Sequence, residues 1–135
     1  MARIVKEVDV DIAPDAAWDA IRDFANPHTR VFTGVLTDAT AEGEIRTVTF
    51  ANGLVAREAL IACNDETKCL VYTASAGSLT HHNASLQVLA NGNGGSRVVW
   101  ILDLLPNEAK PTIEGLMNAG CAAMKATLER QATSP

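Results

Sequence analysis

Four side chains of this 135-residue chain could orient a small molecule and move its protons, and strand spacing predicts that they share one face of a sheet. They are Arg46, Glu58, Tyr72 and His82. A charged group on an otherwise apolar surface is tolerated only when it is paired or hydrogen-bonded. Together, these groups could hold a carboxylate or an enolate by the guanidinium, accept a proton at the glutamate and donate one from the phenol or the imidazole.

The hairpin turn at residues 51–53 decides whether Arg46 and Glu58 meet. If the loop has three residues and Gly53 is left-handed, Arg46 lies directly opposite Glu58. A two-residue Asn-Gly turn would instead place Arg46 opposite Ala59 and mix polar and apolar residues on both faces. We favour the three-residue loop because it separates polar from apolar side chains more completely.

Two interpretations of the Arg46–Glu58 pair remain open at this point. In the structural one, the two side chains satisfy each other and fix the strand register. In the functional one, the two side chains stand apart or are bridged by water instead of contacting each other directly. Arg46 could then orient a ligand and Glu58 could transfer protons. Arg57, the neighbouring arginine, points to solvent in this register.

Tyr72 and His82 are expected on the same inner face as that pair. The hydroxyl of Tyr72 needs a partner, which either a water-filled cavity or a backbone carbonyl would supply. His82 belongs to the apolar side of its strand, whereas His81 belongs to the polar side, so the two cannot chelate one metal ion. With His28 as the third histidine, no metal site is expected.

Hydrophobic periodicity predicts the elements that would position these side chains. Residues 3–12 alternate as a strand, a helix runs from Pro14 to Asn26-Pro27, and a short second helix is possible at 28–33. Extended segments follow at 33–40, 43–51, 54–63, 67–76, 79–90 and 96–105. From Asn107 onward a helix of about 20 residues is expected. Its apolar stripe is Ile113, Leu116, Met117, Gly120, Met124 and Leu128.

Three segments in this order resemble the polyketide cyclase and lipid-transport (START-like, SRPBCC) superfamily over nearly the whole chain. They are Ala13-Pro14-Asp15-Ala16-Ala17-Trp18, Gly43-Glu44-Ile45-Arg46-Thr47-Val48 and the strand end that runs from Leu60 to Asp65-Glu66. The resemblance implies an α+β helix-grip fold of the birch-pollen-allergen type, in which a curved, seven-stranded antiparallel sheet wraps around the C-terminal helix. It also implies one ligand-binding domain over residues 1–135, with an apolar cavity and chemistry that varies between members. The abscisic-acid receptors of this superfamily have an inward Arg and Glu at the places of Arg46 and Glu58.

Strand parity and the helix stripe predict which residues would line such a cavity, of about 300 Å³ or more. They are Val48, Phe50, Ala84, Leu86, Trp100, Met117, Gly120 and Met124. Trp100 should face inward, either lining the cavity or plugging its narrow end. Trp18, in the first helix, is expected to pack against the sheet.

The composition excludes several classes of partner. The formal net charge of −5 leaves no basic surplus for nucleic acid or an anionic membrane. Cys63, Cys69 and Cys121 have no metal-ligand spacing and are expected as reduced thiols. No apolar run approaches the roughly 20 residues of a membrane span, and no nucleotide-binding motif occurs. These features predict a soluble, cytoplasmic protein without a cofactor.

Three functions remain open. The first is a cofactor-independent cyclase and dehydratase that closes a poly-β-ketone, with Glu58 as base, Tyr72 or His82 as acid and Arg46 holding the enolate. The second is a binding or transfer protein for a lipid or aromatic metabolite. The third is an accessory protein with a vestigial cavity. The expected partner is an apolar small molecule, and the protein is expected to be a monomer or a homodimer.

Overall fold

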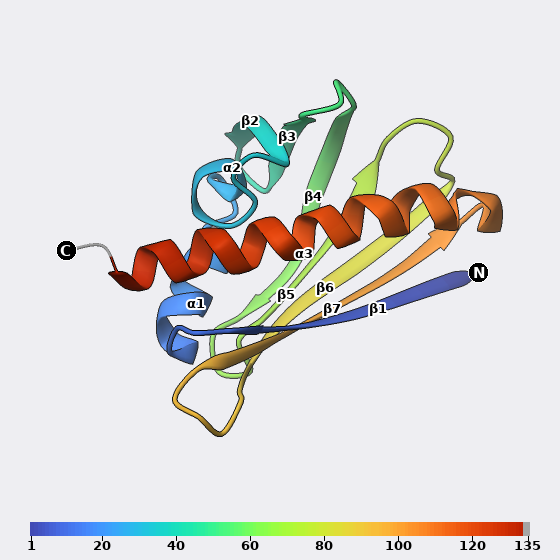
Figure 1. The fold of residues 1–135 in the computed structure, drawn as a ribbon. Helices are drawn as coiled ribbons and strands as arrows, with labels where there is room; N and C mark the ends of the chain where they lie inside the picture. Colours follow the sequence, from blue (N-terminus) through green and yellow to red (C-terminus); the bar gives the residue numbers. More distant parts are fainter. Residues whose placement is uncertain (134–135) are drawn as a thin grey trace.

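Residues 1–133, which the computed structural model describes, form a seven-stranded antiparallel sheet and a long helix that crosses its inner face (Figure 1). The strands are β1 (Ala2–Val10), β2 (Leu36–Glu42), β3 (Ile45–Phe50), β4 (Val55–Asn64), β5 (Cys69–Ser75), β6 (His81–Ala90) and β7 (Ser96–Leu105). The helices are α1 (Pro14–Ile21), α2 (Pro27–Arg30), the 3-10 turn η1 (Asn107–Ala109) and α3 (Lys110–Thr133). The expected α+β helix-grip fold is therefore confirmed.

The sheet order is β1-β7-β6-β5-β4-β3-β2, so the first and last strands of the chain are neighbours. Along β6 and β7, every second side chain is buried, as expected for a sheet with one face against a core. His82 and Trp100 are both on the buried side, whereas His81 is exposed. The inward parity predicted for these two strands is thus confirmed.

The β3–β4 turn has the three-residue form that the polar pattern predicted. Gly53 has a φ of +91°, a left-handed conformation that side chains rarely adopt, and its N–H donates to the carbonyl of Phe50 at 2.9 Å. The resulting register pairs Arg46 with Glu58. Both side chains consequently project from adjacent strands to the same side of the sheet.

Two expected boundaries were wrong. The first helix ends at Ile21, several residues before Asn26-Pro27. The second strand begins at Leu36 instead of residue 33 because the preceding residues form a turn, in which the Leu36 N–H donates to the Phe32 carbonyl at 2.9 Å. This turn presents Phe32 to the interior.

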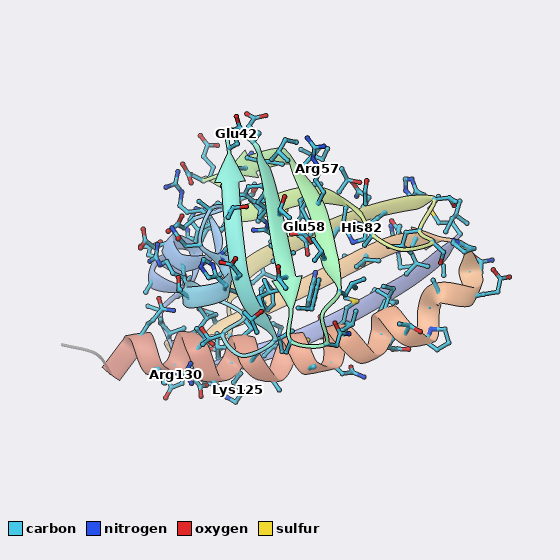
Figure 2. All side chains as sticks on the ribbon, turned by 90° about the horizontal axis from the view of Figure 1, so that it is seen from above. Glu42, Arg57, Glu58, His82, Lys125 and Arg130 are labelled. Carbon is cyan, nitrogen blue, oxygen red and sulfur yellow. The ribbon has the colours of Figure 1, made fainter. Side chains whose placement is uncertain are left out.

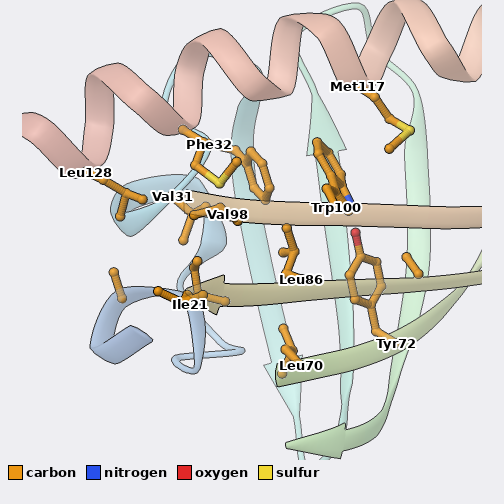
Figure 3. Close-up of a cluster of buried hydrophobic side chains, with 14 of the residues drawn as sticks. Ile21, Val31, Phe32, Leu70, Tyr72, Leu86, Val98, Trp100, Met117 and Leu128 are labelled. Carbon is orange, nitrogen blue, oxygen red and sulfur yellow. The ribbon is translucent and has the colours of Figure 1, made fainter. Parts of the chain in front are cut away.

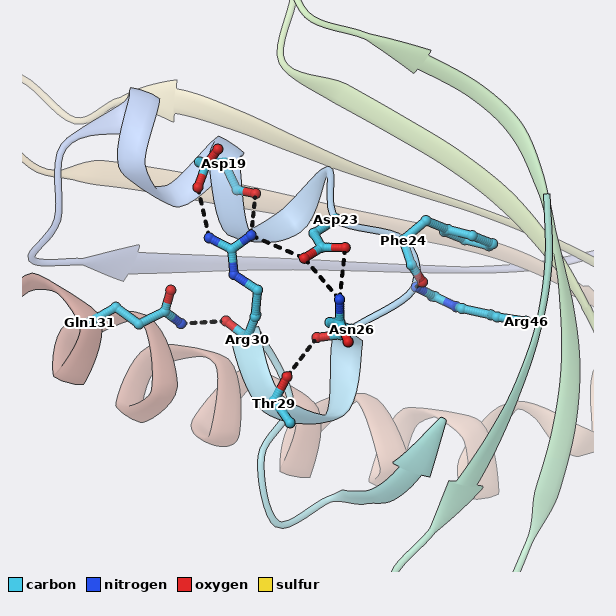
Figure 4. Close-up of polar contacts among 8 residues, drawn as sticks. All are labelled: Asp19, Asp23, Phe24, Asn26, Thr29, Arg30, Arg46 and Gln131. Atoms are coloured by element: carbon cyan, nitrogen blue, oxygen red, sulfur yellow. Dashed lines mark hydrogen bonds and ion pairs between the residues drawn. The ribbon is translucent and has the colours of Figure 1, made fainter. Parts of the chain in front are cut away.

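The two short helices are tied to the rest of the fold by polar contacts. Arg30 of α2 donates to Asp19 at 2.7 Å and to Asp23 at 3.1 Å, and Gln131 of α3 donates to the Arg30 carbonyl at 2.6 Å (Figure 4). Trp18 is buried, as expected for a packing residue. These contacts close one end of the space between sheet and helix.

Trp100 divides that space into two parts. Its ring packs directly against Gly120 of α3, where an added Cβ would lie 2.9 Å from Cζ3, and against Phe32 at a ring-centroid distance of 5.2 Å. On one side of Trp100 the interior is filled by apolar side chains, including Leu128, Val98 and Ile21 (Figure 3). The other side is hollow.

Candidate ligand-binding site

The hollow half of the interior is an apolar pocket of about 80 Å³ between the sheet and α3. It adjoins a recess of about 330 Å³ at the surface, which lies between the loops at residues 51–54 and 76–79 and the first turns of α3. Five residues line both spaces and are called the neck here: Leu54, Ala76, Leu79, Ile113 and Leu116. This pocket is smaller than the expected 300 Å³, and the rings of Trp100 and Phe32 are among the large side chains that line it.

Arg46 and Glu58 form a buried ion pair in the pocket wall. The Nε of Arg46 donates to Oε1 of Glu58 at 2.7 Å, and the two side chains are only 4% and 10% exposed. The Nη1 of Arg46 donates to the Phe24 carbonyl at 3.1 Å (Figure 4). Arg57 is exposed and lies at the outer margin of the sheet (Figure 2), as predicted.

Aromatic rings flank the guanidinium of Arg46. Its Cζ lies 4.0 Å from the ring centroid of Phe24 and 5.2 Å from that of Tyr72. A cation over a ring face gains about 0.5–2 kcal/mol in such surroundings. The pair is therefore held in place from several sides, which favours the structural interpretation of its role over a pair bridged by water.

Tyr72 points its hydroxyl across the pocket toward the indole nitrogen of Trp100 (Figure 3). Burial raises the pKa of Tyr72 strongly, and the negative charge of Glu58 adds to this effect, while Arg46 and Trp100 oppose it. Tyr72 is therefore a protonated phenol at neutral pH. Trp100 Nε1 is buried and, among the described residues, has no hydrogen bond of normal geometry, so its contact with the Tyr72 hydroxyl is not a regular bond.

His82 lies on the pocket wall beside Tyr72, with the two ring centroids 5.8 Å apart. Desolvation lowers the pKa of His82 to about 4, so the imidazole is neutral at pH 7. Its Nδ1 is buried without a hydrogen-bond partner in the described part of the chain. An unsatisfied buried polar atom costs about 1–3 kcal/mol, and such atoms in a pocket are suited to a ligand.

The structure brings together all four candidate chemical residues and most of the expected lining. Arg46, Glu58, Tyr72 and His82 line the pocket with Val48, Phe50, Trp100, Met117 and Gly120. Ala84, Leu86 and Met124 do not line it, which corrects the expectation for them. These three are buried in the apolar core instead. Strand and helix parity identifies an inward side chain but not the point at which the interior changes from hollow to filled.

Sequence reasoning missed several residues that shape the site. Phe24, which the helical period placed on the apolar side of the first helix, and Phe32 both come from the segment that joins α1 to β2. Leu79 comes from the β5–β6 loop and forms part of the neck. The available signal for all three was the presence of large apolar residues in loops, where polar residues are the rule.

No group of three or more His, Cys, Asp or Glu side chains in residues 1–133 is arranged to hold a metal ion. No helix in that range has both the length and the apolar character needed to cross a membrane. Cys63, Cys69 and Cys121 are free thiols.

Solved structures with the same fold include bacterial and plant proteins. XoxI from Bacillus cereus is 19% identical, with a TM-score of 0.86 over 99% of this chain and 100% of that chain. An uncharacterized protein from Bacillus thuringiensis is 17% identical, with a TM-score of 0.83 over 94% and 98%. Norcoclaurine synthase from Thalictrum flavum is 18% identical, with a TM-score of 0.74 over 99% and 87%. That synthase has also been solved in complex with dopamine and hydroxybenzaldehyde.

At these identities the likeness concerns the fold alone. No curated protein sequence matches the chain. A family model described as polyketide cyclase / dehydrase and lipid transport matches residues 1–133. Since this match spans nearly the whole chain and agrees with the observed sheet, helix and apolar pocket, the protein belongs to the polyketide cyclase / dehydrase and lipid transport family.

Proposed function

We propose that this protein binds a small apolar molecule that enters through the surface recess and extends past the neck into the pocket. The observation that carries the proposal is the apolar pocket that adjoins an open recess of small-molecule size. The neck is made of aliphatic side chains, which favour an apolar body over a polar one. The pocket wall beyond it carries the polar groups that would orient the ligand.

The size of the two spaces favours a compact ligand. About 80 Å³ behind the neck accepts a single functional group or part of a ring, whereas the recess of about 330 Å³ accepts a ring system or a short chain. The small aromatic compounds bound by norcoclaurine synthase, which shares the fold, support a ligand of this scale. A long folded polyketide fits these volumes poorly.

Acid–base catalysis by Glu58, Tyr72, His82 and Arg46 is the second candidate. The adjacency of Tyr72 and His82 in the pocket favours it. Against it, Arg46 holds Glu58 in the pocket wall, since its Nε donates to the Oε1 of Glu58 at 2.7 Å, so the carboxylate is not free to move toward a ligand. The geometry therefore supports binding or transfer more strongly than cyclisation.

The test is a titration with N-phenyl-1-naphthylamine, an uncharged probe that fluoresces in apolar surroundings. We expect saturable binding to the wild type and at least tenfold weaker binding to Ala76→Phe, because this residue belongs to the neck. Ala41→Phe places the same side chain on an exposed position of β2 and should bind like the wild type. Equal affinity in all three proteins, or no saturation in the wild type, would contradict the proposal.

A further inference from the structure

The pocket wall holds a concentration of hydrogen-bonding atoms that the protein itself does not satisfy. Trp100 and His82 are each only 7% exposed. Within residues 1–133, His82 Nδ1 has no hydrogen-bond partner, and Trp100 Nε1 has only its irregular contact with the Tyr72 hydroxyl. Both residues line the pocket. The Tyr72 ring lies 5.8 Å from that of His82 between centroids, and the Tyr72 hydroxyl points toward the indole of Trp100 (Figure 3). An indole N–H can only donate, so whatever satisfies Trp100 must be an acceptor.

The charges of the pocket are balanced before any ligand arrives. In the described part of the chain, the formal charges of the lining are those of Arg46 and Glu58, which pair at 2.7 Å. Two groups that could have added charge do not, because Tyr72 remains protonated and His82 remains neutral at pH 7. Glu108 in the recess adds a negative charge on the way in. A buried carboxylate would thus enter without a free cation to pair with, which is costly in an apolar site.

From these observations, and resting on the proposed function, we infer that the site selects an uncharged carbonyl compound, a ketone, aldehyde or amide, and rejects the corresponding carboxylate. The carbonyl oxygen accepts from Trp100 Nε1 and from the Tyr72 hydroxyl, and His82 contacts the same end of the ligand. The apolar body of the ligand lies in the neck and recess.

Three probes of nearly the same shape test the carbonyl hydrogen bond and the rejection of a negative charge separately at pH 7.5. Acetophenone has the carbonyl, isopropylbenzene replaces it with a methyl-bearing carbon, and benzoate carries a negative charge. Binding of any of them is followed at the methyl group of Met117, a pocket residue, by NMR. The hydrogen bond is followed at the Trp100 indole N–H signal. The indole N–H of Trp18, which already donates to Asp65 at 2.8 Å, is an internal control.

We expect acetophenone to move the Met117 methyl signal and to shift the Trp100 indole proton downfield while Trp18 stays in place. Isopropylbenzene should move the Met117 signal without that downfield shift, and benzoate should bind at least about tenfold more weakly than acetophenone. Trp100→Phe should lower the affinity for acetophenone about tenfold, the equivalent of one hydrogen bond. It should lower the affinity for isopropylbenzene less than about threefold. Trp18→Phe assigns the second indole signal and should leave both affinities unchanged.

Benzoate binding as tightly as acetophenone would overturn the inference, as would acetophenone binding that leaves the Trp100 indole signal unmoved. In either case the pocket still binds ligands, and the proposed function stands. If none of the three probes moves the Met117 methyl signal, the inference fails together with the proposed pocket. The wild-type indole measurement decides the matter even if Trp100→Phe does not fold.

Discussion

At the scale of single residues, the molecule keeps a charged pair where an apolar pair would pack. Arg46 and Glu58 are buried on adjacent strands and hydrogen-bond to each other, and Arg46 also reaches the Phe24 carbonyl. Pairs of this kind contribute little net stability relative to well-packed apolar residues. Removing one partner, however, leaves the other charge buried and unpaired in apolar surroundings. Losing one member of this pair should therefore destabilise the protein far more than losing both, which would not hold for a surface ion pair.

Arg46→Met should lower the free energy of unfolding by about 3–5 kcal/mol, because Glu58 remains buried without its partner. The double variant Arg46→Met/Glu58→Leu should recover most of that loss. Urea unfolding measures both, and Arg57→Met on the exposed face of β4 should stay within about 0.5 kcal/mol of the wild type. A double variant as unstable as the single one would show that the unpaired charge is not the cause.

At the scale of elements, α3 packs closely against the Trp100 ring of β7 at a position where the helix has no side chain. Gly120 allows the ring of Trp100 to lie against the helix backbone, and this contact forms the wall between the filled and the hollow halves of the interior. At Gly115, on the same helix, an added Cβ would point into open space. An alanine at either position raises helix propensity, but only an alanine at position 120 also crowds Trp100. Comparing the two substitutions therefore distinguishes the two effects.

Gly120→Ala should destabilise the protein by about 1–3 kcal/mol, because the new Cβ would lie 2.9 Å from Trp100 Cζ3 and overpacking outweighs propensity. Gly115→Ala should stabilise it by about 0.5–1 kcal/mol, the propensity gain alone. Thermal or urea unfolding of the two variants side by side is the measurement. A stabilising Gly120→Ala would mean that Trp100 moves aside freely, and the wall would then be adjustable.

At the scale of the whole molecule, the hollow half gives the protein a characteristic dependence on pH. His82 has a pKa of about 4 in the folded protein against about 6.5 in an unfolded chain. Between these values the unfolded chain binds a proton at His82 that the folded protein does not. The part of the stability that depends on a neutral His82 is therefore present above about pH 6.5 and is lost as the pH falls toward 4. Asp65 and Asp103, whose pKa values are lowered by hydrogen bonds from Trp18 and Arg3, act in the same direction at lower pH.

His82 should account for about 2 kcal/mol of the stability lost between pH 7 and pH 5. His82→Gln should therefore show a correspondingly smaller loss over this interval, whereas His81→Gln should keep the wild-type dependence. Urea unfolding at both pH values provides the comparison. Parallel losses in the wild type and His82→Gln would place the folded-state pKa of His82 near its ordinary value.

The sequence by itself determined the order of the elements, the register of the β3–β4 hairpin and the side of the sheet on which Arg46, Glu58 and His82 lie. These features follow from local rules: the period of the apolar residues, the need for a left-handed residue at Gly53 and the separation of polar from apolar faces. They act over a few residues, so they can be seen in one chain without its fold.

Only the tertiary structure decided where the interior is hollow. Ala84, Leu86 and Met124 share the parity of true pocket residues yet lie in the filled core, while Phe24 and Phe32 enter the site from loops. The boundary depends on how far Trp100 reaches from β7 to Gly120, a distance set by the packing of sheet against helix. Packing of that kind sums many weak contacts between residues far apart in the chain, and no local pattern contains it.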